Sequence, residues 1–165
     1  MKIVSDSSVI ISLWRIERIQ LLPTLFGEIL IPPAVVAEIG VHGKAGSDIF
    51  QQLEWLKPLS VRDLNLPKLV QSLAGFRNLD AGETEAIALA LAIQADAILI
   101  DEHRGRNVAE RAGLRVTGVL GILLLAKNQG LLMEIRPVLD DLIAVGFRLD
   151  ASLYQRMITL AGEAL

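Results

Sequence analysis

The order of apolar segments along the chain restricts its possible folds more than any other feature. Short apolar runs of strand length, such as "AILI" (97–100), alternate with segments in which apolar residues recur at helical spacing. Strands that alternate with helices form a parallel sheet whose two faces are covered by those helices. The sequence therefore predicts an α/β fold: a three-layer α/β/α arrangement with a central, mainly parallel sheet and a helical C-terminal tail.

Residues 1–165 are expected to form a single domain, because no repeat, linker or low-complexity stretch divides the chain. The apolar pattern predicts strands at residues 2–5, 28–33, 56–61, 97–100 and 114–118. It predicts helices at residues 8–27, 34–40, 48–53, 79–94, 104–113, 119–129, 134–145 and 152–163.

Composition excludes several classes of protein. The chain has no cysteine, which excludes a disulfide framework and thiolate metal sites and favours a reducing, cytoplasmic location. The longest apolar stretch, residues 86–100, contains Gln94 and Asp96 and is shorter than the roughly 20 residues that a membrane span needs. Asp6 also interrupts the N-terminal segment where a signal peptide would be continuously apolar. We therefore expect a soluble protein without a membrane partner.

Acidic residues follow two of the expected strands. Asp6 comes directly after the first strand and Asp101 directly after residues 97–100. The carboxyl ends of parallel strands form the edge of the sheet where ligands bind. Glu38, on the helix after the second strand, and Glu83, at the start of the long helix before residues 97–100, can reach the same edge. We expect these four carboxylates to converge in one crevice.

Carboxylates that share a crevice repel one another and raise some of their pKa values, and a bound divalent cation relieves the repulsion. Surroundings of carboxylate and water oxygens suit Mg²⁺ or Mn²⁺. Each acid also has a purely structural interpretation: Asp6 as the N-cap of the following helix, Glu38 as a solvated helix residue, and Glu83 as the partner of an Asp80 N-cap in a capping box. Their shared position is what favours a metal site.

Four motifs in series resemble those of the PIN-domain family. They are "VSDSSVIISL" with Asp6, "VVAEI" with Glu38, "LDAGETEAIALALA" with Glu83 and "ILIDEHRGRNVAERAGLRVTG" with Asp101. The resemblance covers residues 2–126 and is closest to a small prokaryotic subgroup. It implies a central parallel sheet and a Mg²⁺- or Mn²⁺-dependent nuclease centre, in which these four acids are the catalytic and metal-binding residues.

Three further residues have a place in the resemblance. Glu85 is an alternative to Glu83 as the third acid, and Glu102 is an alternative to Asp101 as the fourth. Ser7 matches a small hydroxyl residue that often follows the first acid. It is expected to contribute to the nucleic-acid site by hydrogen bonding to a carboxylate or to a metal-bound water.

Many small prokaryotic PIN proteins resemble the VapC-like toxins of toxin–antitoxin pairs. This resemblance implies an endoribonuclease that hydrolyses RNA phosphodiester bonds with water as the nucleophile and that is blocked by a protein antitoxin. The resemblance also favours a homodimer, as do the long apolar stretches at residues 119–129 and 134–145, for which burial within the core of one chain is the alternative explanation. The alternative is a catalytically inactive PIN-like module that binds RNA or a protein partner.

The net charge of −3 provides no general attraction for RNA, so binding must depend on local basic residues. Arg104 and Arg106 follow Asp101 closely and are expected to bind nucleic acid, since guanidinium groups suit phosphate oxygens. The alternative is that the two arginines simply pair with Asp101 and Glu102.

Two other phosphate chemistries lack their motifs. A haloacid-dehalogenase-type phosphatase would need a second Asp two residues after Asp6, where this chain has Ser8. The glycine-containing segment "GVHGKAGS" has neither the glycine spacing of a P-loop nor a strand directly before it.

Overall fold

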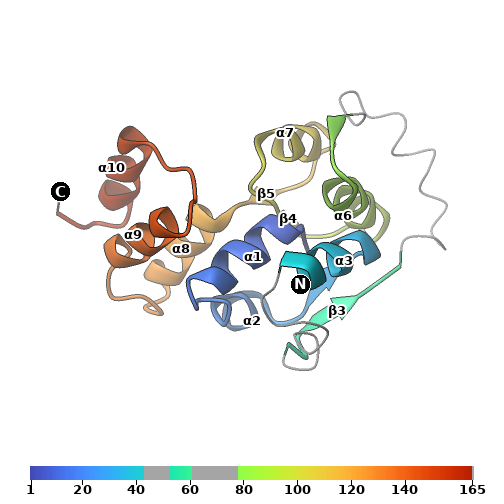
Figure 1. Ribbon diagram of the computed structural model, residues 1–165, viewed down its shortest axis with the longest axis horizontal. Coiled ribbons are helices and arrows are strands. Elements are labelled where there is room, and N and C mark those ends of the chain that lie inside the picture. Colours follow the sequence, from blue (N-terminus) through green and yellow to red (C-terminus); the bar gives the residue numbers. More distant parts are fainter. Residues whose placement is uncertain (43–52, 61–77, 165) are drawn as a thin grey trace.

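In a computed structural model of the chain, residues 1–42, 53–60 and 78–164 are described, and they contain one sheet of five parallel strands in the order β3-β2-β1-β4-β5 (Figure 1). The strands are β1 (Ile3–Ser5), β2 (Ile29–Ile31), β3 (Leu56–Pro58), β4 (Ala97–Leu99) and β5 (Val116–Thr117). The helices are α1 (Ser7–Arg15), α2 (Leu21–Phe26), α3 (Pro33–His42), α6 (Ala81–Ala92), α7 (His103–Arg111), α8 (Val119–Asn128), α9 (Arg136–Ala144) and α10 (Ala151–Leu160).

Alternate residues of the strands face two separate apolar cores, as the period-2 geometry of a strand requires. Ile3 and Leu99 pack on one face with apolar residues of α1, α2, α3 and α8. Val4 and Ile98 pack on the other face with α6 and α7, which lie together on one side of the sheet in Figure 1. The predicted three-layer α/β/α fold is therefore confirmed.

The order of the strands reverses beside β1. The chain adds β2 and β3 on one side of β1, and then returns through α6 to place β4 on the other side. Ligands of open parallel sheets bind where the strand order reverses in this way, outside the carboxyl ends of the strands. The fold therefore directs attention to the residues that follow β1 and β4.

The N-terminal helical segment differs from its prediction. The expected helix at 8–27 is two helices, because the chain turns between α1 and α2 with Glu17 in the left-handed region at φ 57°. Ile16 and Ile19, on either side of this turn, are both buried in the main core at 7 % and 8 % exposure. Burial of these side chains thus outweighs the strain of a non-glycine residue at positive φ.

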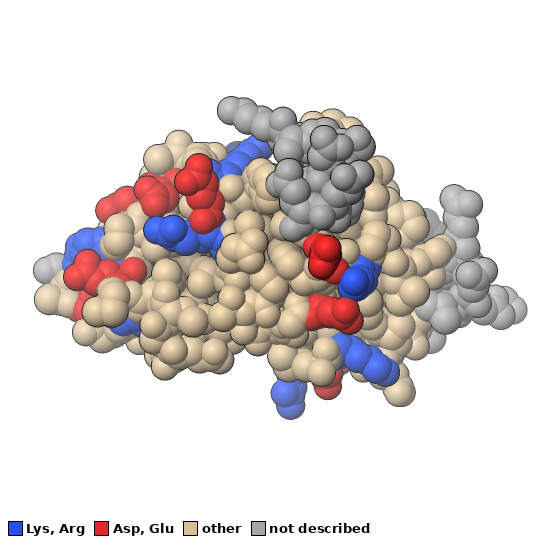
Figure 2. Space-filling view, turned by 90° about the horizontal axis from the view of Figure 1, so that it is seen from below, with Lys and Arg blue, Asp and Glu red and all other residues tan. Residues whose placement is uncertain are grey.

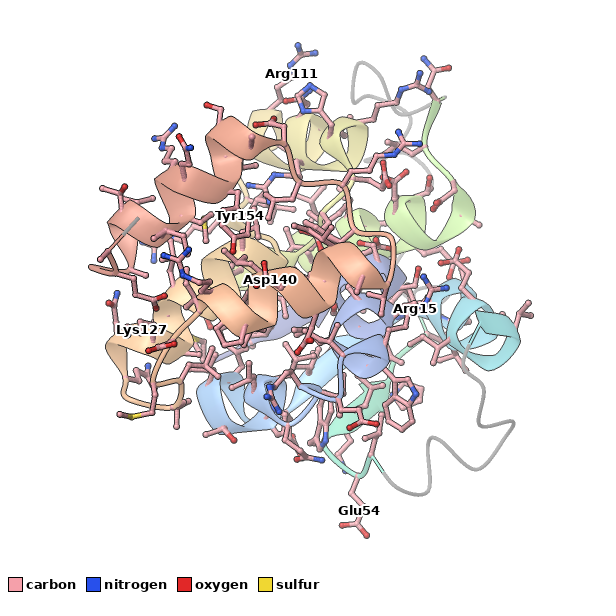
Figure 3. The ribbon with its side chains drawn as sticks, turned by 60° about the vertical axis from the view of Figure 1, so that its left-hand side comes forward. Arg15, Glu54, Arg111, Lys127, Asp140 and Tyr154 are labelled. Atoms are coloured by element: carbon pink, nitrogen blue, oxygen red, sulfur yellow. The ribbon has the colours of Figure 1, made fainter. Side chains whose placement is uncertain are left out.

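The apolar C-terminal tail is largely part of the main core. Val119, Ile122 and Leu123 of α8 have no exposed surface, and α9 and α10 cover them at one end of the molecule (Figure 1). Figure 3 shows Tyr154 of α10 facing Asp140 of α9, and its hydroxyl donates a hydrogen bond of 2.8 Å to that carboxylate. The apolar pattern that suggested a dimer is therefore explained in large part by burial within one chain.

Two predicted elements cannot be compared in full. Of the expected helix at 48–53, all but the last residue lies outside the described part of the chain. The expected strand at 56–61 is present as β3, which ends at Pro58. Among the described residues no helix is both long enough and apolar enough to cross a membrane.

Candidate metal centre

The sheet brings Asp6 and Asp101 to the same edge. Ser5, the last residue of β1, is paired in register with Leu99 of β4, and the Asp6 N–H donates a hydrogen bond of 2.9 Å to the Leu99 carbonyl. Asp6 therefore leaves the sheet beside the end of β4, and Asp101 follows two residues after Leu99. Both acids lie at the carboxyl edge of the sheet, as the sequence predicted, and the structure shows that the strand order reverses there.

Ser8 joins these two strand ends through its hydroxyl group. Its Oγ donates a hydrogen bond of 2.7 Å to Asp6 Oδ2 and accepts one of 3.3 Å from the Asp101 N–H. The Ser8 N–H also donates to Asp6 Oδ2, so Asp6 is the N-cap of α1. The structural interpretation of Asp6 is correct, but it accounts for only one of the two carboxylate oxygens.

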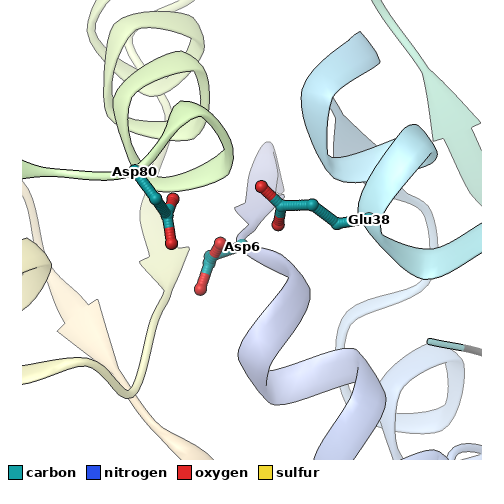
Figure 4. A group of neighbouring side chains, drawn as sticks. All are labelled: Asp6, Glu38 and Asp80. Atoms are coloured by element: carbon teal, nitrogen blue, oxygen red, sulfur yellow. The ribbon is translucent and has the colours of Figure 1, made fainter. Parts of the chain in front are cut away.

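Two more helices bring acids to Asp6. Glu38 lies on α3, and Asp80 is the N-cap of α6. Ligand oxygens of Asp6, Glu38 and Asp80 all lie within 4.8 Å of one another, and Figure 4 shows the three carboxylates pointing toward one space. Oxygens at this separation can share one cation.

Glu38 is held in this position by hydrogen bonds to both of its oxygens. Ser7 Oγ donates a hydrogen bond of 2.5 Å to Glu38 Oε2, and the Gly82 N–H donates one of 3.0 Å to Oε1. Ser7 is itself buried, at 9 % exposure. The structure thus places Ser7 against a carboxylate, which is one of the two contacts expected for it.

Asp80 and Glu83 form the predicted capping box at the start of α6. The Glu83 N–H donates a hydrogen bond of 2.8 Å to Asp80 Oδ1, and the Asp80 N–H donates one of 3.1 Å to Glu83 Oε2. Asp80 was expected only as this cap, and its place in the acidic cluster was not predicted from the sequence. One feature of the sequence could have indicated this place: Asp80 is a negatively charged N-cap only three residues before Glu83, which was already a candidate ligand.

Glu83 and Asp101 flank the cluster, because Glu83 accepts the Asp80 N–H and the Asp101 N–H donates to the same Ser8 hydroxyl that donates to Asp6. Burial, with smaller contributions from the charges of Asp80 and Asp6, raises the pKa of Glu83 to about 7, against the lowering effect of the hydrogen bond from the Asp80 N–H. Burial raises the pKa of Asp101 to about 6, while the Val119 N–H and the Arg106 charge oppose that rise and Asp6 adds to it. Burial also raises the pKa of Asp6, against the hydrogen bonds from α1.

Three buried carboxylate oxygens have no hydrogen-bond partner within the described part of the chain. They are Asp6 Oδ1, Glu83 Oε1 and Asp101 Oδ2, and the side chains of Asp6 and Glu83 are only 2 % and 5 % exposed. Unpaired buried carboxylates are costly, and a divalent cation supplies the missing partner. With the compact oxygen set of Asp6, Glu38 and Asp80, this donor chemistry fits Mg²⁺ or Mn²⁺.

Glycines lie against three of the acids. A Cβ at Gly82 would be 2.4 Å from Glu38 Oε2, and one at Gly118 would be 2.3 Å from Asp101 Oδ1. A Cβ at the third, Gly105 of α7, would lie 2.6 Å from Glu83 Oε1. Because these three glycines have no side chain, the carboxylates can lie directly against the backbone. The sequence does not reveal this reason for the glycines of the motifs.

The alternative acids, Glu85 and Glu102, have other surroundings. Glu85 Oε2 accepts a hydrogen bond of 2.9 Å from the N–H of Ala34, so it caps the first turn of α3. Glu102 is exposed at the N-cap position of α7 without a side-chain capping bond. Both lie outside the compact cluster of Asp6, Glu38 and Asp80.

Arg104 and Arg106, the two arginines expected to bind nucleic acid, differ in burial and in hydrogen bonding. Arg106 is partly buried, and its Nη1 donates a hydrogen bond of 3.0 Å to the Ile100 carbonyl close to Asp101. This is nearer to the alternative expectation, in which the arginine neutralises a site acid. Arg104 is exposed at the start of α7 and remains a candidate for phosphate binding.

Comparison with known proteins adds one result to this geometry. A family model described as a PIN domain matches residues 2–163. No curated protein and no solved structure gives a significant match. The matched region continues well past residue 126, where the recognised motifs end, so α8, α9 and α10 belong to the same family unit as the sheet.

Proposed function

The chain belongs to the PIN-domain family, and from this membership we propose that it is a metal-dependent nuclease that hydrolyses phosphodiester bonds in RNA. The observation that carries the proposal is the set of unpaired, buried carboxylate oxygens beside a cluster of three acids at the reversal of strand order. A stable structural role would leave those oxygens hydrogen-bonded, whereas a cation site requires them free.

Asp6, Glu38 and Asp80 would hold the divalent cation, with Glu83 and Asp101 on its flanks. When bound, such a cation lowers the pKa of the attacking water and stabilises charge that develops on the phosphodiester. Ser7 and the Gly82 N–H fix the orientation of Glu38, so this ligand does not have to be ordered during the reaction.

Glu83 and Asp101 would act on the water and the departing group. Glu83 Oε1 and Asp101 Oδ2 are free to accept O–H groups, and the raised pKa of Glu83, about 7, suits a group that takes up or releases a proton near neutral pH. We propose that Glu83 orients the attacking water and that Asp101 contacts the departing group.

The proposed substrate is RNA, and the proposed biological role is the toxin of a toxin–antitoxin pair. This finer assignment is supported by the resemblance of the four acidic motifs to small VapC-like proteins. It includes a protein antitoxin that blocks the site. A homodimer is proposed on the same resemblance, with exposed apolar side chains such as Met133 and Leu160, at 88 % and 57 % exposure, available for association.

The experiment that tests the activity uses the purified chain and a labelled single-stranded RNA with Mg²⁺ or Mn²⁺. We expect metal-dependent internal cleavage that is abolished by Asp6→Asn. The control is Glu54→Gln, which should leave cleavage unchanged because Glu54 is an exposed acid at the opposite end of the sheet (Figure 3). Equal cleavage by the Asp6→Asn variant would show that the catalytic assignment is wrong. Absence of Mn²⁺ binding in a titration of the wild type would favour the non-cutting PIN-like module.

The toxin role has a separate test. Induced expression of the chain is expected to arrest growth, and the arrest is expected to disappear in the Asp6→Asn and Asp101→Asn variants. Growth that continues despite an active nuclease would contradict the toxin role while leaving the nuclease activity in place.

A further inference from the structure

A groove leads away from Asp101 beside α1. It encloses about 530 Å³, and its lining includes Ser12 and Arg15 of α1 together with Phe147 and Arg148 of the segment after α9. We call this hollow the Arg148 groove. It begins at one of the acids that flank the proposed cation site and continues onto a surface formed by the C-terminal half of the chain.

A second hollow of about 430 Å³ adjoins the Arg148 groove. The two share Asp101, Phe147 and Arg148 as lining residues, and the second continues past Gly118 toward α8 and α10. Phe147 and Arg148 therefore stand between two depressions that meet at Asp101. A bound polymer of two or more residues has room in both hollows and would pass Asp101.

The end of α9 fixes the position of Phe147 and Arg148. The Gly146 N–H donates a hydrogen bond of 3.0 Å to the Ile143 carbonyl, and the Phe147 N–H donates one of 2.9 Å to the Leu142 carbonyl. Gly146 has φ 93°, so this is a glycine-dependent helix ending in which the chain reverses direction sharply. Phe147 is also packed partly against the main core, which limits its movement.

Both arginines of the groove are exposed and lack partners. Within the described residues neither the Arg15 nor the Arg148 side chain forms an ion pair or a hydrogen bond, whereas Lys57 and Lys127 pair with glutamates. Figure 3 shows Arg15 extending from α1 beside the end of α9. In Figure 2 acidic and basic side chains lie interspersed on the face shown, so a chain of net charge −3 offers no broad positive surface there.

We propose that the Arg148 groove binds a single-stranded nucleic acid next to the acidic centre, with Arg15 and Arg148 on backbone phosphates and Phe147 against a base. The proposal rests on the proposed function, because the bound strand is the one to be cut. Two unpaired guanidinium groups suit phosphate oxygens, and an aromatic side chain in the same lining supplies the stacking surface that single-strand sites use. None of the three residues was identified from the sequence.

The test measures binding separately from cleavage. All proteins carry Asp6→Asn, and fluorescence anisotropy gives the Kd for a labelled 12-nucleotide RNA and for the DNA of the same sequence. The compared changes are Arg15→Gln, Arg148→Gln and Phe147→Leu, with Arg111→Gln as the matched control. Arg111 is an exposed arginine at the end of α7 that lies away from Arg15 in Figure 3 and, within the described residues, has no ion pair.

We expect each arginine change to weaken binding about tenfold and to reduce the slope of log Kd against log salt concentration by about 0.7, as loss of one phosphate contact to a single strand requires. Phe147→Leu is expected to weaken binding about tenfold without changing that slope. These results in either the RNA or the DNA arm support the groove, and the ratio of the two affinities identifies the strand that it prefers.

Wild-type affinity in all three groove variants, or an equal loss in Arg111→Gln, would overturn the proposal. Absence of binding to both oligonucleotides would overturn it as well. The nuclease proposal fails separately, when wild-type protein with Mg²⁺ or Mn²⁺ does not cleave RNA, so the two outcomes are distinguishable.

Discussion

Gly82 lies so close to Glu38 that a Cβ at this glycine would be within 2.4–2.7 Å of three atoms of the Glu38 carboxyl group. The atoms in the way belong to the end of a flexible side chain, so Gly82→Ala would displace the carboxylate rather than disrupt the backbone. We expect Gly82→Ala to lower Mn²⁺ affinity by roughly 10–100-fold, as loss of a supporting contact does in metal sites. Isothermal titration with MnCl₂ measures this, and thermal unfolding is expected to change little.

The matched control is Gly40→Ala on the same helix as Glu38. Among the described residues, and apart from its chain neighbours and the backbone of its own helix, nothing lies within 4 Å of a Cβ at Gly40, so alanine is expected to stabilise α3 by about 0.5–1 kcal/mol without changing Mn²⁺ affinity. Equal Mn²⁺ affinity in the Gly82→Ala and Gly40→Ala variants would contradict the placement of Glu38 at the cation.

Asp80 is both the N-cap of α6 and a proposed ligand of the cation, and one substitution can separate these two roles. Asn is as good an N-cap as Asp but has no negative charge, so Asp80→Asn is expected to keep α6 intact while lowering Mn²⁺ affinity about tenfold or more. Asp150→Asn is the control, because Asp150 caps α10 with a 2.8 Å bond from the Leu153 N–H, as Asp80 does with the Glu83 N–H. Both variants should unfold at nearly the wild-type temperature. An unchanged Mn²⁺ affinity in Asp80→Asn would remove Asp80 from the metal site.

The raised pKa values predict how the metal-free protein responds to pH. Burial raises the pKa of Glu83 from 4.5 to about 7 and that of Asp101 from 3.8 to about 6. Between about pH 4 and pH 7 the folded chain therefore binds more protons than the unfolded chain, and the free energy of unfolding falls as the pH rises. We expect a loss of about 1–3 kcal/mol across this range, measured by urea unfolding in EDTA.

Added Mg²⁺ or Mn²⁺ should restore more stability at pH 7.5 than at pH 5, because cation and proton compete for the same oxygens. Asp101→Asn is expected to flatten the part of the pH dependence below about pH 6, since it removes the group with that pKa. Stability of the metal-free wild type that is constant or rises between pH 5 and pH 7.5 would contradict the clustered carboxylates.

The sheet was predictable from sequence because its evidence is local. Runs such as residues 97–100 are continuously apolar, and continuous apolar strands occur where both faces of a parallel sheet are covered. The same rule placed Asp6 and Asp101 at one edge, since each directly follows its strand. The break between α1 and α2 was not predictable, because it depends on which core Ile16 and Ile19 can reach after folding.

The candidate site was predictable only in part, for a similar reason. Asp80 has the sequence signature of a helix cap, and only its position three residues before Glu83 indicated that it would lie near Glu38, which is on another helix. Arg15 is separated from Phe147 and Arg148 by more than half of the chain, and it meets them only because α9 ends next to α1. The four motifs identified acids that lie far apart in the chain, whereas Arg15, Phe147 and Arg148 lie outside all four motifs.

Glu83 and Glu85 are two residues apart, and the sequence left open which of them is the third acid. The structure gives them different partners: Glu85 accepts the Ala34 N–H of α3, while Glu83 caps α6 and leaves Oε1 unpaired. Glu85→Ala should therefore destabilise the fold by about 1 kcal/mol through the lost cap, with little change in Mn²⁺ affinity. Glu83→Gln, which keeps a capping oxygen, should stabilise the metal-free protein at pH 8 and weaken Mn²⁺ binding, because it removes a buried charge. Paired urea unfolding and Mn²⁺ titration distinguish the two, and the reverse pattern would assign the metal to Glu85.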